Sequence, residues 1–538
     1  MDNKTIAKYF ALLADLMELH NENSFKIKSY DFAGRHLKNL DVELANLSVD
    51  ELEKIDGVGK AIAEKIYHLT HTGKFELLEK YLAITPPGII ELFQLKGIGP
   101  KKIAQLWKEL EIESIGELEY ACNENRLITL KGFGAKTQQN ILDQLHFITQ
   151  NANLFLWASL EELANTIVAE LQETYPDLLV SVCGDFRRKE ITLEKVDILI
   201  ATENETIQNT IDEKYINDPV QFHFCKQDEF YLKLLEKSSD AEHFGFLSFK
   251  IDASKKYTSE KEIYEDANLP FIAPEIRDSK FEFKLVEANK LDQLIELKHI
   301  KGVVHAHSKY SDGANSLKDL ATYCKQQGFE YLVISDHSKS AFYADGMQVE
   351  KILQQHEEIE KLNKALFPFK IFKSVESDIL YDGNLDYEDE VLKTFDLIIA
   401  SVHSQLKMNE ERSMLRLIKA IENPYTTILG HMTGRLLLSR QAYPVDHKKI
   451  IDACAANKVC IELNANPRRL DIDYKWIDYC QEKNVLISIN PDAHNLNGVH
   501  DIKYGVFAAR KGGLLKENTL NALTKDNFEQ YLLDNKKW

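Results

Sequence analysis

The C-terminal part of the chain, from residue 291 onward, carries a repeating pattern that leaves few folds open. Seven short apolar runs occur at 302–306, 331–335, 370–375, 396–401, 426–430, 459–463 and 486–490, with helical segments between most of them. Strands that alternate with helices form parallel sheets, and this many units in succession predict a distorted, closed (βα)7 barrel. Nearly every run ends in polar residues: HAHS, SDHS, ESD, SVHS, GHMTGR, NAN and NPDAH. The C-terminal strand ends of a barrel converge on one face, so these residues are predicted to meet there.

The predicted face gathers imidazoles and carboxylates, namely His305, His307, Asp312, His337, Glu376, His403, His431, Asp492 and His494. His305 and His307 are expected on one side of a strand, because side chains alternate with a period of two. One zinc ion takes about four ligands, so this set predicts two or three divalent ions with Glu376 bridging. Imidazole and carboxylate without thiolate favour Mn²⁺, Zn²⁺ or Fe²⁺ over Mg²⁺.

Any one of these histidines alone is more simply a core or surface residue. Of the nine histidines after residue 300, however, six fall at predicted strand ends, whereas His356, His447 and His500 do not. Clustered metal ions lower the pKa of a bound water and neutralise charge on a phosphoryl group. The pattern therefore predicts phosphoester hydrolysis, with Asp492 and His431 among the catalytic residues. Arg435, in GHMTGR, either clamps a substrate phosphate or braces the strand end.

Length and composition indicate an ordinary globular protein of several domains. The chain has 538 residues, of which 44% are hydrophobic and 28% charged, and domains usually hold roughly 100–200 residues. No apolar run approaches the ~20 residues that span a bilayer, and the N-terminus lacks the regions of a signal peptide. The seven cysteines form no CxxC pair, which favours reduced thiols. A cytoplasmic protein without membrane contact is expected.

Residues 1–150 contain three copies of one motif, IDGVGKAIAEKI (55–66), LKGIGPKKIAQL (95–106) and LKGFGAKTQQNI (130–141). Their glycine pairs are Gly57 and Gly59, Gly97 and Gly99, and Gly132 and Gly134. Such glycines permit a tight turn with positive φ and leave the N–H groups of the next helix start exposed to an anion. A helix cap explains one copy equally well. Three copies predict helix-hairpin-helix contacts with a DNA backbone, although a net charge of −19 by itself disfavours nucleic acid.

Residues 151–290 have the pattern of an α+β region, with a helix near 159–174 and strands near 179–184, 195–201 and 219–225. The stretch GDFRRKEITLEKVDILIA (184–201) combines a glycine turn, the paired Arg187 and Arg188, and a strand that carries Asp197. This layout suits a triphosphate and a metal-binding carboxylate. Paired arginines and a strand-end aspartate are also common surface features.

Several motifs together resemble known families. HAHSKYSDG, SDHS, SVHS, GHMTGR and NPDAH resemble the polymerase and histidinol phosphatase (PHP) family of metal hydrolases. With FKIKSY, the glycine turns, GDFRR, KEIYEDANLPFIAPEIRD (261–278) and PRRLD (467–471), the whole chain resembles the bacterial family X DNA polymerase/3′-5′ exonucleases. The resemblance implies a lyase-like helical domain (1–80), a fingers-like helix-hairpin-helix domain (81–150), a nucleotidyltransferase-like palm (151–230), a thumb-like region (231–290) and a PHP barrel (291–538).

The resemblance also implies three ligand sets in the barrel. The first metal would take His305, His307, Glu376 and Asp492, the second Glu376, His403 and His431, and the third Asp312, His337 and His494. It further matches Lys65 to a lysine that forms a Schiff base with 5′-deoxyribose phosphate. The alternative is a solvated helix lysine, because Asp31 and Phe32 replace the basic residues expected nearby.

The palm-like part departs from its family at the polymerase site, whose residues here are Asp185, Arg187, Arg188, Lys195 and Asp197. The family has Gly-Ser before the arginines and Asp-x-Asp on the next strand, whereas this chain has Gly184-Asp185 and Lys195-Val196-Asp197. Two-metal nucleotidyl transfer needs carboxylates to hold both ions, so a lysine there repels the metal. No third carboxylate stands on 219–224, and SSDAEH (238–243) lacks the family's glycine.

The sequence therefore predicts a DNA repair protein whose barrel is a metal-dependent 3′-5′ exonuclease, with abasic-site cleavage as a second activity and polymerase activity lost or weak. The expected partner is gapped, nicked or 3′-ended DNA, held mainly through its backbone by a protein that we expect to be a monomer. Three alternatives stay open: an active family X DNA polymerase, a small-molecule phosphatase of the histidinol phosphate kind, and a non-catalytic DNA-end-binding scaffold.

Overall fold

The computed structural model describes residues 1–538 apart from 41, 56, 111, 116–117, 119–120, 123–126, 128–129, 151–153, 253–254, 279–280, 342–343, 439–440 and 538. Two compact units make up the chain, Met1–Ala152 and Asn153–Trp538. In the described part of the chain, no helix combines the length and apolar character needed to cross a membrane.

The N-terminal unit is helical. Its helices are α1 (Asn3–Leu19), α2 (Ser24–His36), α3 (Val49–Leu52), α4 (Lys60–Thr72), α5 (Glu76–Ala83), α6 (Pro87–Leu92), α7 (Pro100–Leu110) and α9 (Ala135–Gln150). Helix α1 buries Ile6, Phe10, Leu13 and Met17, which lie on one face at helical spacing, and it packs against α2, α5 and α7. The three glycine motifs directly precede α4, α7 and α9.

The second unit begins with a small α+β part. Its elements are β1 (Phe155–Leu156), α10 (Trp157–Thr174), β2 (Val180–Cys183), α11 (Gly184–Arg187), β3 (Thr192–Leu193), β4 (Val196–Ala201), α12 (Glu205–Lys214) and β5 (Val220–Cys225). The sheet order is β2-β4-β5, with β2 antiparallel and β5 parallel to the central strand β4. Leu160, Ala164, Ile167 and Leu171 of α10 are buried in the core of this part, since their spacing places them on one face of the helix. The helices α13 (Phe230–Lys237), α14 (Ala241–Ser248), α15 (Glu260–Asp266) and α16 (Glu282–Glu287) follow.

The rest of the unit is a parallel sheet that nearly closes into a barrel. Its strands are β6 (Gly302–Ala306), β7 (Tyr331–Ile334), β8 (Lys370–Asp378), β9 (Leu397–Ser401), β10 (Ile428–Leu429), β11 (Cys460–Asn464) and β12 (Ile487–Asn490). They pair in sequence order from β6 to β12. An isolated parallel bridge between Ala306 and Ala493 joins the two ends of the sheet. Each strand lies within one of the seven predicted runs or overlaps it.

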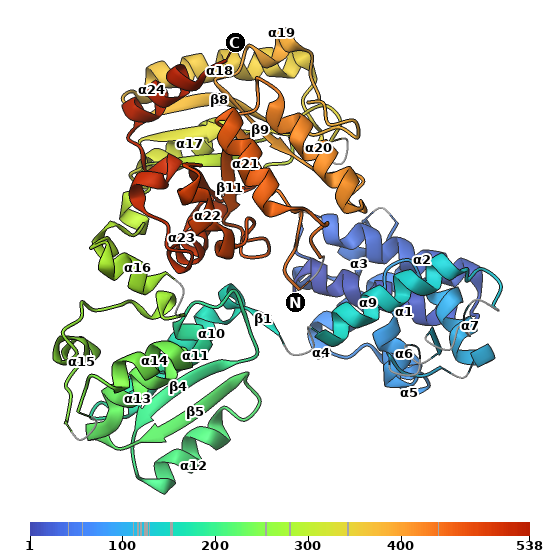
Figure 1. The fold of residues 1–538 in the computed structure, drawn as a ribbon. Coiled ribbons are helices and arrows are strands. Elements are labelled where there is room, and N and C mark those ends of the chain that lie inside the picture. Colours follow the sequence, from blue (N-terminus) through green and yellow to red (C-terminus); the bar gives the residue numbers. More distant parts are fainter. Residues whose placement is uncertain are drawn as a thin grey trace. The chain divides into compact units, whose positions relative to one another are not determined.

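Helices cover the outside of this barrel, as Figure 1 shows for α17, α18, α20 and α21. The barrel helices are α17 (Leu317–Gln326), α18 (Val349–Leu366), α19 (Asp389–Leu392), α20 (Glu410–Glu422), α21 (His447–Asn457), α22 (Ile477–Glu482), α23 (Ile502–Lys511) and α24 (Lys525–Asn535). The predicted fold class is confirmed: a helical N-terminal region with glycine turns, an α+β palm-like part and a distorted (βα)7 barrel. The finer division into five domains stays a prediction.

Ion pairs join the α+β part to the barrel within the second unit. Lys511 of α23 is buried and contacts Asp278 and, at 2.8 Å, Glu190. Asp278 also accepts a hydrogen bond from Arg188 at 3.1 Å. Burying a lysine requires such partners, so these contacts tie α23 to the residues around the glycine turn at Gly184.

Gly302 provides a test of the barrel packing. A Cβ at this position would lie 2.1 Å from a ring carbon of Tyr331 on the neighbouring strand, and the Tyr331 ring is itself buried against Phe528. We expect Gly302→Ala to destabilise the barrel by about 1–3 kcal/mol, because the ring has no space to move into. Hydrogen-exchange mass spectrometry of the β6 and β7 segments measures the change.

Gly498→Ala is the matched control in the same barrel. Its Cβ would meet its nearest neighbours at 3.4 Å, an ordinary contact, so protection of β6 and β7 should stay as in the parent chain. Equal protection in both variants would contradict the described packing of Gly302 against Tyr331.

Candidate functional site

The nine polar residues predicted to meet at the barrel face lie together in the structure. They follow or end β6, β7, β8, β9, β10 and β12. Eight of them form three overlapping groups whose ligand atoms lie within 4.8 Å of one another. The groups are His305, His307 and Asp492; His337, Glu376 and His403; and His307, Asp312, His337 and His494. His431 joins the second group, since its Nε2 lies 3.0 Å from Glu376 Oε1.

These groups overlap with the three expected ligand sets and differ from them in two respects: Glu376 belongs to the second group alone, and two histidines are shared between groups. His307 and His337 each belong to two groups. Glu376 lies between the first two groups, with Oε1 3.3 Å from His305 Nε2 and 3.1 Å from His403 Nε2. This carboxylate therefore has the position that a bridging ligand requires.

A backbone irregularity orients His305 and His307, the two histidines of the HAHS motif. The pairing register of β6 with β7 shifts between Val304 and Ala306, and His305 has a φ of 67°. A bulge of this kind redirects side chains next to active sites. His305 and His307 converge on Asp492, with Nε2–Oδ1 distances of 3.5 and 3.1 Å. The expected convergence thus comes from a bulge, and regular alternation along a strand is not its cause.

Two buried carboxylates accept hydrogen bonds from two imidazoles of the cluster. Glu462 of β11 is fully buried and accepts a hydrogen bond from His305 Nδ1 at 2.6 Å. Asp378 of β8 accepts one from His403 Nδ1 at 2.5 Å. Such contacts fix the tautomer and orientation of a ligating imidazole. Neither residue was predicted from the sequence, although Asp378 stands two residues after Glu376 on one strand and could have been found from that spacing.

The charges of this cluster stabilise one another. Burial alone would raise the pKa of Glu376, but His403, His305 and His337 hold that pKa well below its ordinary value. Burial and the neighbouring His337 lower the pKa of His307 to about 4. Glu376 is therefore ionised and His307 neutral at pH 7, which are the protonation states that metal ligands need.

Several buried ligand atoms are suited to metal ions. His305 Nε2, His307 Nδ1, His431 Nδ1 and Glu376 Oε2 are buried and make no hydrogen bond to any described residue. Buried polar atoms normally have partners. These atoms face the cluster from different strands, and a nitrogen and oxygen donor set without thiolate suits Mn²⁺, Zn²⁺ or Fe²⁺. The residues present therefore fit a centre of divalent ions.

Two arginines lie near this face and differ in their contacts. Arg435 donates to the carbonyl oxygens of Arg469 and Leu470 and, at 2.7 Å, to Asp473. Its donors thus brace the segment after β11, which favours the bracing interpretation over the phosphate clamp. The guanidinium of Arg469, by contrast, approaches the cluster, with Nε 3.8 Å from Asp492 Oδ2.

In the α+β part, one carboxylate stands at the position of the polymerase site. Asp197 on β4 pairs with Gln221 of β5 in the sheet register, so Lys195, Asp197, Gln221 and His223 lie on one face. Asp197 Oδ1 lies 2.7 Å from His223 Nε2, and Lys195 donates to Gln221 Oε1 at 3.3 Å. The neighbouring strand therefore places an amide and an imidazole beside Asp197, where a third carboxylate is expected.

The paired arginines of this part are engaged in ion pairs. Arg187 contacts Glu260, which also accepts a hydrogen bond from the fully buried Arg277 at 2.7 Å. Arg188 contacts Asp185 at 2.5 Å as well as Asp278. Partners on α11, on α15 and on the segment before α16 thus bind the guanidinium groups that the sequence pattern suggested for a triphosphate.

The three glycine turns share one geometry. The first glycine of each has a positive φ, of 77° at Gly57, 84° at Gly97 and 88° at Gly132. The apolar residue between each glycine pair is buried, whereas nothing lies within 4 Å of a Cβ built on Gly59, Gly99 or Gly134. Open space thus surrounds three helix N-termini, which is the condition for a backbone phosphate to approach. Lys65 is half-buried on α4, and its Nζ donates to the Ala61 carbonyl at 3.1 Å.

The fold and the sites together define a multidomain enzyme of the nucleic-acid-processing class, and comparisons with known proteins agree. Residues 1–75 match the helix-hairpin-helix domain, 89–146 the SAM-like helix-hairpin-helix tandem, 158–260 the DNA polymerase beta palm and 304–466 the PHP domain. The barrel resembles probable phosphatases of Thermoanaerobacter sp. (strain X514), at 25% identity over 43% of this chain and 94% of the relative, and of Caldanaerobacter subterraneus, at 26% identity over 43% and 91%.

A longer match covers the whole chain. The DNA polymerase/3′-5′ exonuclease PolX of Bacillus subtilis (strain 168) is 32% identical over an alignment of 574 positions, gaps included, which spans 99% of this chain and all of the relative. The chain therefore belongs to the PolX family of DNA polymerase/3′-5′ exonucleases. The helix-hairpin-helix matches support DNA binding, and the PHP match implies divalent metal ions.

Glu462 provides a test of the support behind the cluster. Its oxygens accept hydrogen bonds from His305 and from the backbone of His431, and also from the amides of Asn464 and Asn490. In Glu462→Gln, an amide N–H₂ would face donors, so His305 should lose its fixed orientation. We expect Mn²⁺ affinity to fall about 10–100-fold, as measured by calorimetry.

Glu358→Gln is the control for this variant. Glu358 accepts a hydrogen bond from the Tyr310 hydroxyl at 2.8 Å, which a glutamine can also accept, so its Mn²⁺ affinity should match that of the parent chain. Unchanged affinity in Glu462→Gln would show that this carboxylate does not support the metal ligands.

Proposed function

We propose that this chain is a metal-dependent 3′-5′ exodeoxyribonuclease whose barrel hydrolyses the phosphodiester and whose palm no longer adds nucleotides. The observation that carries the proposal is a contrast between the two sites. The barrel brings together nine side chains that could bind metal ions, of which only Asp312 is exposed. On strands β4 and β5 of the palm there is one carboxylate, Asp197, with Lys195, Gln221 and His223 around it.

In the barrel, the chain's own residues orient the reacting groups. Bound divalent ions would supply a water of lowered pKa and neutralise charge on the phosphate. Asp492 is held in place by His307 at one oxygen and by the amide of Asn464, at 3.1 Å, at the other. The backbone N–H of His431 is fixed by Glu462 at 3.0 Å. These contacts support the proposal that Asp492 and His431 act as catalytic residues at the face where the phosphodiester would bind.

The palm residues do not suit two-metal nucleotidyl transfer. That reaction needs clustered carboxylates. Lys195 lies two residues before Asp197, which is the only carboxylate residue on β4. The arginines that would contact a triphosphate are bound to Glu260, Asp185 and Asp278. The palm would therefore serve as a scaffold, and the three glycine turns of the N-terminal unit would hold the DNA backbone.

Abasic-site cleavage by the same metal centre is part of this proposal, because it is also a phosphodiester hydrolysis. A lyase role for Lys65 has less support, because its Nζ is bound to a helix carbonyl. A small-molecule phosphatase has no use for three glycine turns, and an active polymerase is disfavoured by Lys195. A non-catalytic scaffold does not account for the buried ligand atoms that lack hydrogen-bond partners.

Loss of a ligand tests the nuclease site. We expect His307→Ala or Asp492→Ala to lower Mn²⁺-dependent cleavage of 3′-ended DNA by at least about 10³-fold, because each removes a group that holds the metal centre. Binding of gapped DNA, measured by fluorescence anisotropy, should stay within about twofold. His356→Ala, which alters a histidine outside the cluster, is the control, and cleavage retained by both ligand variants would refute the proposed site.

A primer assay tests the palm. In Asp492→Ala, which is expected not to shorten DNA, a labelled primer on a template should keep its length when Mn²⁺ and all four nucleotides are added. Growth of the primer would show that the palm is an active polymerase in spite of Lys195. The Bacillus subtilis relative, named as a DNA polymerase, serves as the positive control for the assay.

A further inference from the structure

We propose that Arg469 binds the phosphate of the substrate in the barrel site. This inference deepens the proposed function, because it assigns the contact that recognises the charge of the scissile group. Arg469 belongs to PRRLD, on the segment that follows β11, and no metal ligand lies on that segment.

The position of the Arg469 side chain is the first observation. Its Nε lies 3.8 Å from Asp492 Oδ2, and the side chain is 18% exposed. A guanidinium has five N–H donors. In the described part of the chain, none of the five side-chain donors of Arg469 makes a hydrogen bond. A mostly buried cation with unused donors thus stands at the edge of the metal-binding face.

The contacts of the Arg469 backbone are the second observation. Arg435 Nε donates to the Arg469 carbonyl at 2.9 Å, and another nitrogen of its guanidinium donates to the Leu470 carbonyl. Thr433 binds Asp471 Oδ2 through its N–H at 3.0 Å and its hydroxyl at 2.9 Å. The barrel thus holds the chain at Arg469 and at the two residues that follow it, so the backbone from which the Arg469 side chain extends is fixed.

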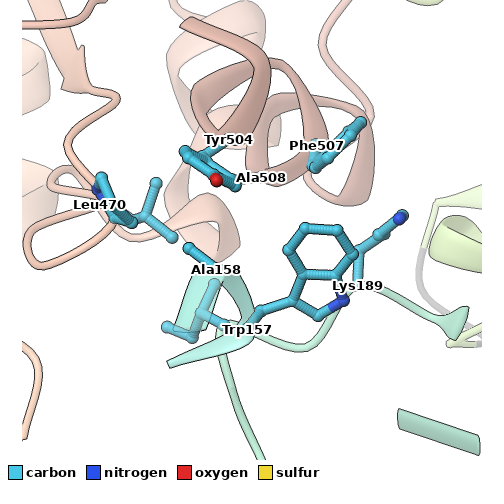
Figure 2. Close-up of a pocket in the computed structure, with 9 residues that line it drawn as sticks. Trp157, Ala158, Lys189, Leu470, Tyr504, Phe507 and Ala508 are labelled. Carbon is cyan, nitrogen blue, oxygen red and sulfur yellow. The ribbon is translucent and has the colours of Figure 1, made fainter. Parts of the chain in front are cut away.

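The α+β part lies beside the same segment. Leu470 and Pro467 line a small hollow together with Trp157 and Ala158 of α10. Figure 2 shows Leu470 beside Ala158 and Trp157, with Tyr504 and Phe507 of α23 above them. The centroids of the Trp157 and Phe507 rings lie 5.4 Å apart. Leu470 is buried in this contact while its neighbour Arg469 extends toward Asp492.

The chemistry of a guanidinium matches a phosphodiester anion. Its planar donors bind two phosphate oxygens at once, with bonds roughly twice as strong as neutral ones. Of the two arginines described near the metal-binding face, Arg435 is already committed to Asp473. Arg469 is therefore the side chain placed to align the phosphate beside Asp492.

Binding of inorganic phosphate to the Mn²⁺-loaded full chain tests this assignment by calorimetry. We expect Arg469→Gln to weaken phosphate binding at least ~10-fold, since a charge-assisted pair is lost. Arg469→Lys should recover only part of it, because an ammonium cannot bind two oxygens in one plane. Arg468→Gln, which alters the exposed neighbour, should bind phosphate as the parent does.

Metal content and cleavage complete the experiment. Arg469→Gln should keep the parent's Mn²⁺ stoichiometry while its kcat/KM on 3′-ended DNA falls ~10²-fold. Phosphate affinity equal to that of Arg468→Gln would overturn the assignment. A parent chain that binds phosphate through Arg469 but does not cut DNA would instead refute the proposed nuclease and leave the phosphate site in place.

Discussion

The carboxylate of Glu376 is the group on which the barrel face depends. It is buried at the end of β8 and contacts imidazoles from several strands, among them His305 from β6, His337 after β7, His403 after β9 and His431 after β10. An isolated buried charge is costly, and here the imidazoles offset that cost. Because each partner comes from a different strand, the cluster forms only when the sheet closes in its observed order. The metal-binding face therefore requires this strand order.

In the α+β part, by contrast, charged residues form ion pairs that stabilise the structure. Glu260 joins Arg187 and the buried Arg277, and Asp278 joins Arg188 and the buried Lys511. Removing one partner from such pairs leaves an uncompensated buried charge. The ion pairs of Arg187 and Arg188 therefore give these two residues a structural role that requires no nucleotide.

Much of the barrel could be predicted from the sequence, because parallel strands place residues that are far apart in sequence at one edge. His337 and His403 needed only the strand ends to be located. The bulge at His305 could not be predicted, since it depends on the register between β6 and β7. Glu462 was missed because its hydrogen bond to His305 spans 157 positions.

The two arginines near the face show the same limit. Arg435 lies close to His431 in sequence, which suggested a phosphate clamp, but its partner Asp473 is 38 residues away. Arg469 carried no signal beyond its place in PRRLD. In the palm, Asp197 was predicted on its strand, whereas His223 beside it follows from the pairing of β4 with β5. Contacts set by tertiary register are the part that sequence patterns leave open.

The identity of the product released from DNA tests the central claim most directly. The parent chain is incubated with Mn²⁺ and primed DNA labelled at its 3′-terminal nucleotide, and the released label is separated by chromatography. A 3′-5′ exonuclease releases the label as a nucleoside monophosphate while the primer shortens one nucleotide at a time. Release of inorganic phosphate alone, or a primer of unchanged length, would contradict the account.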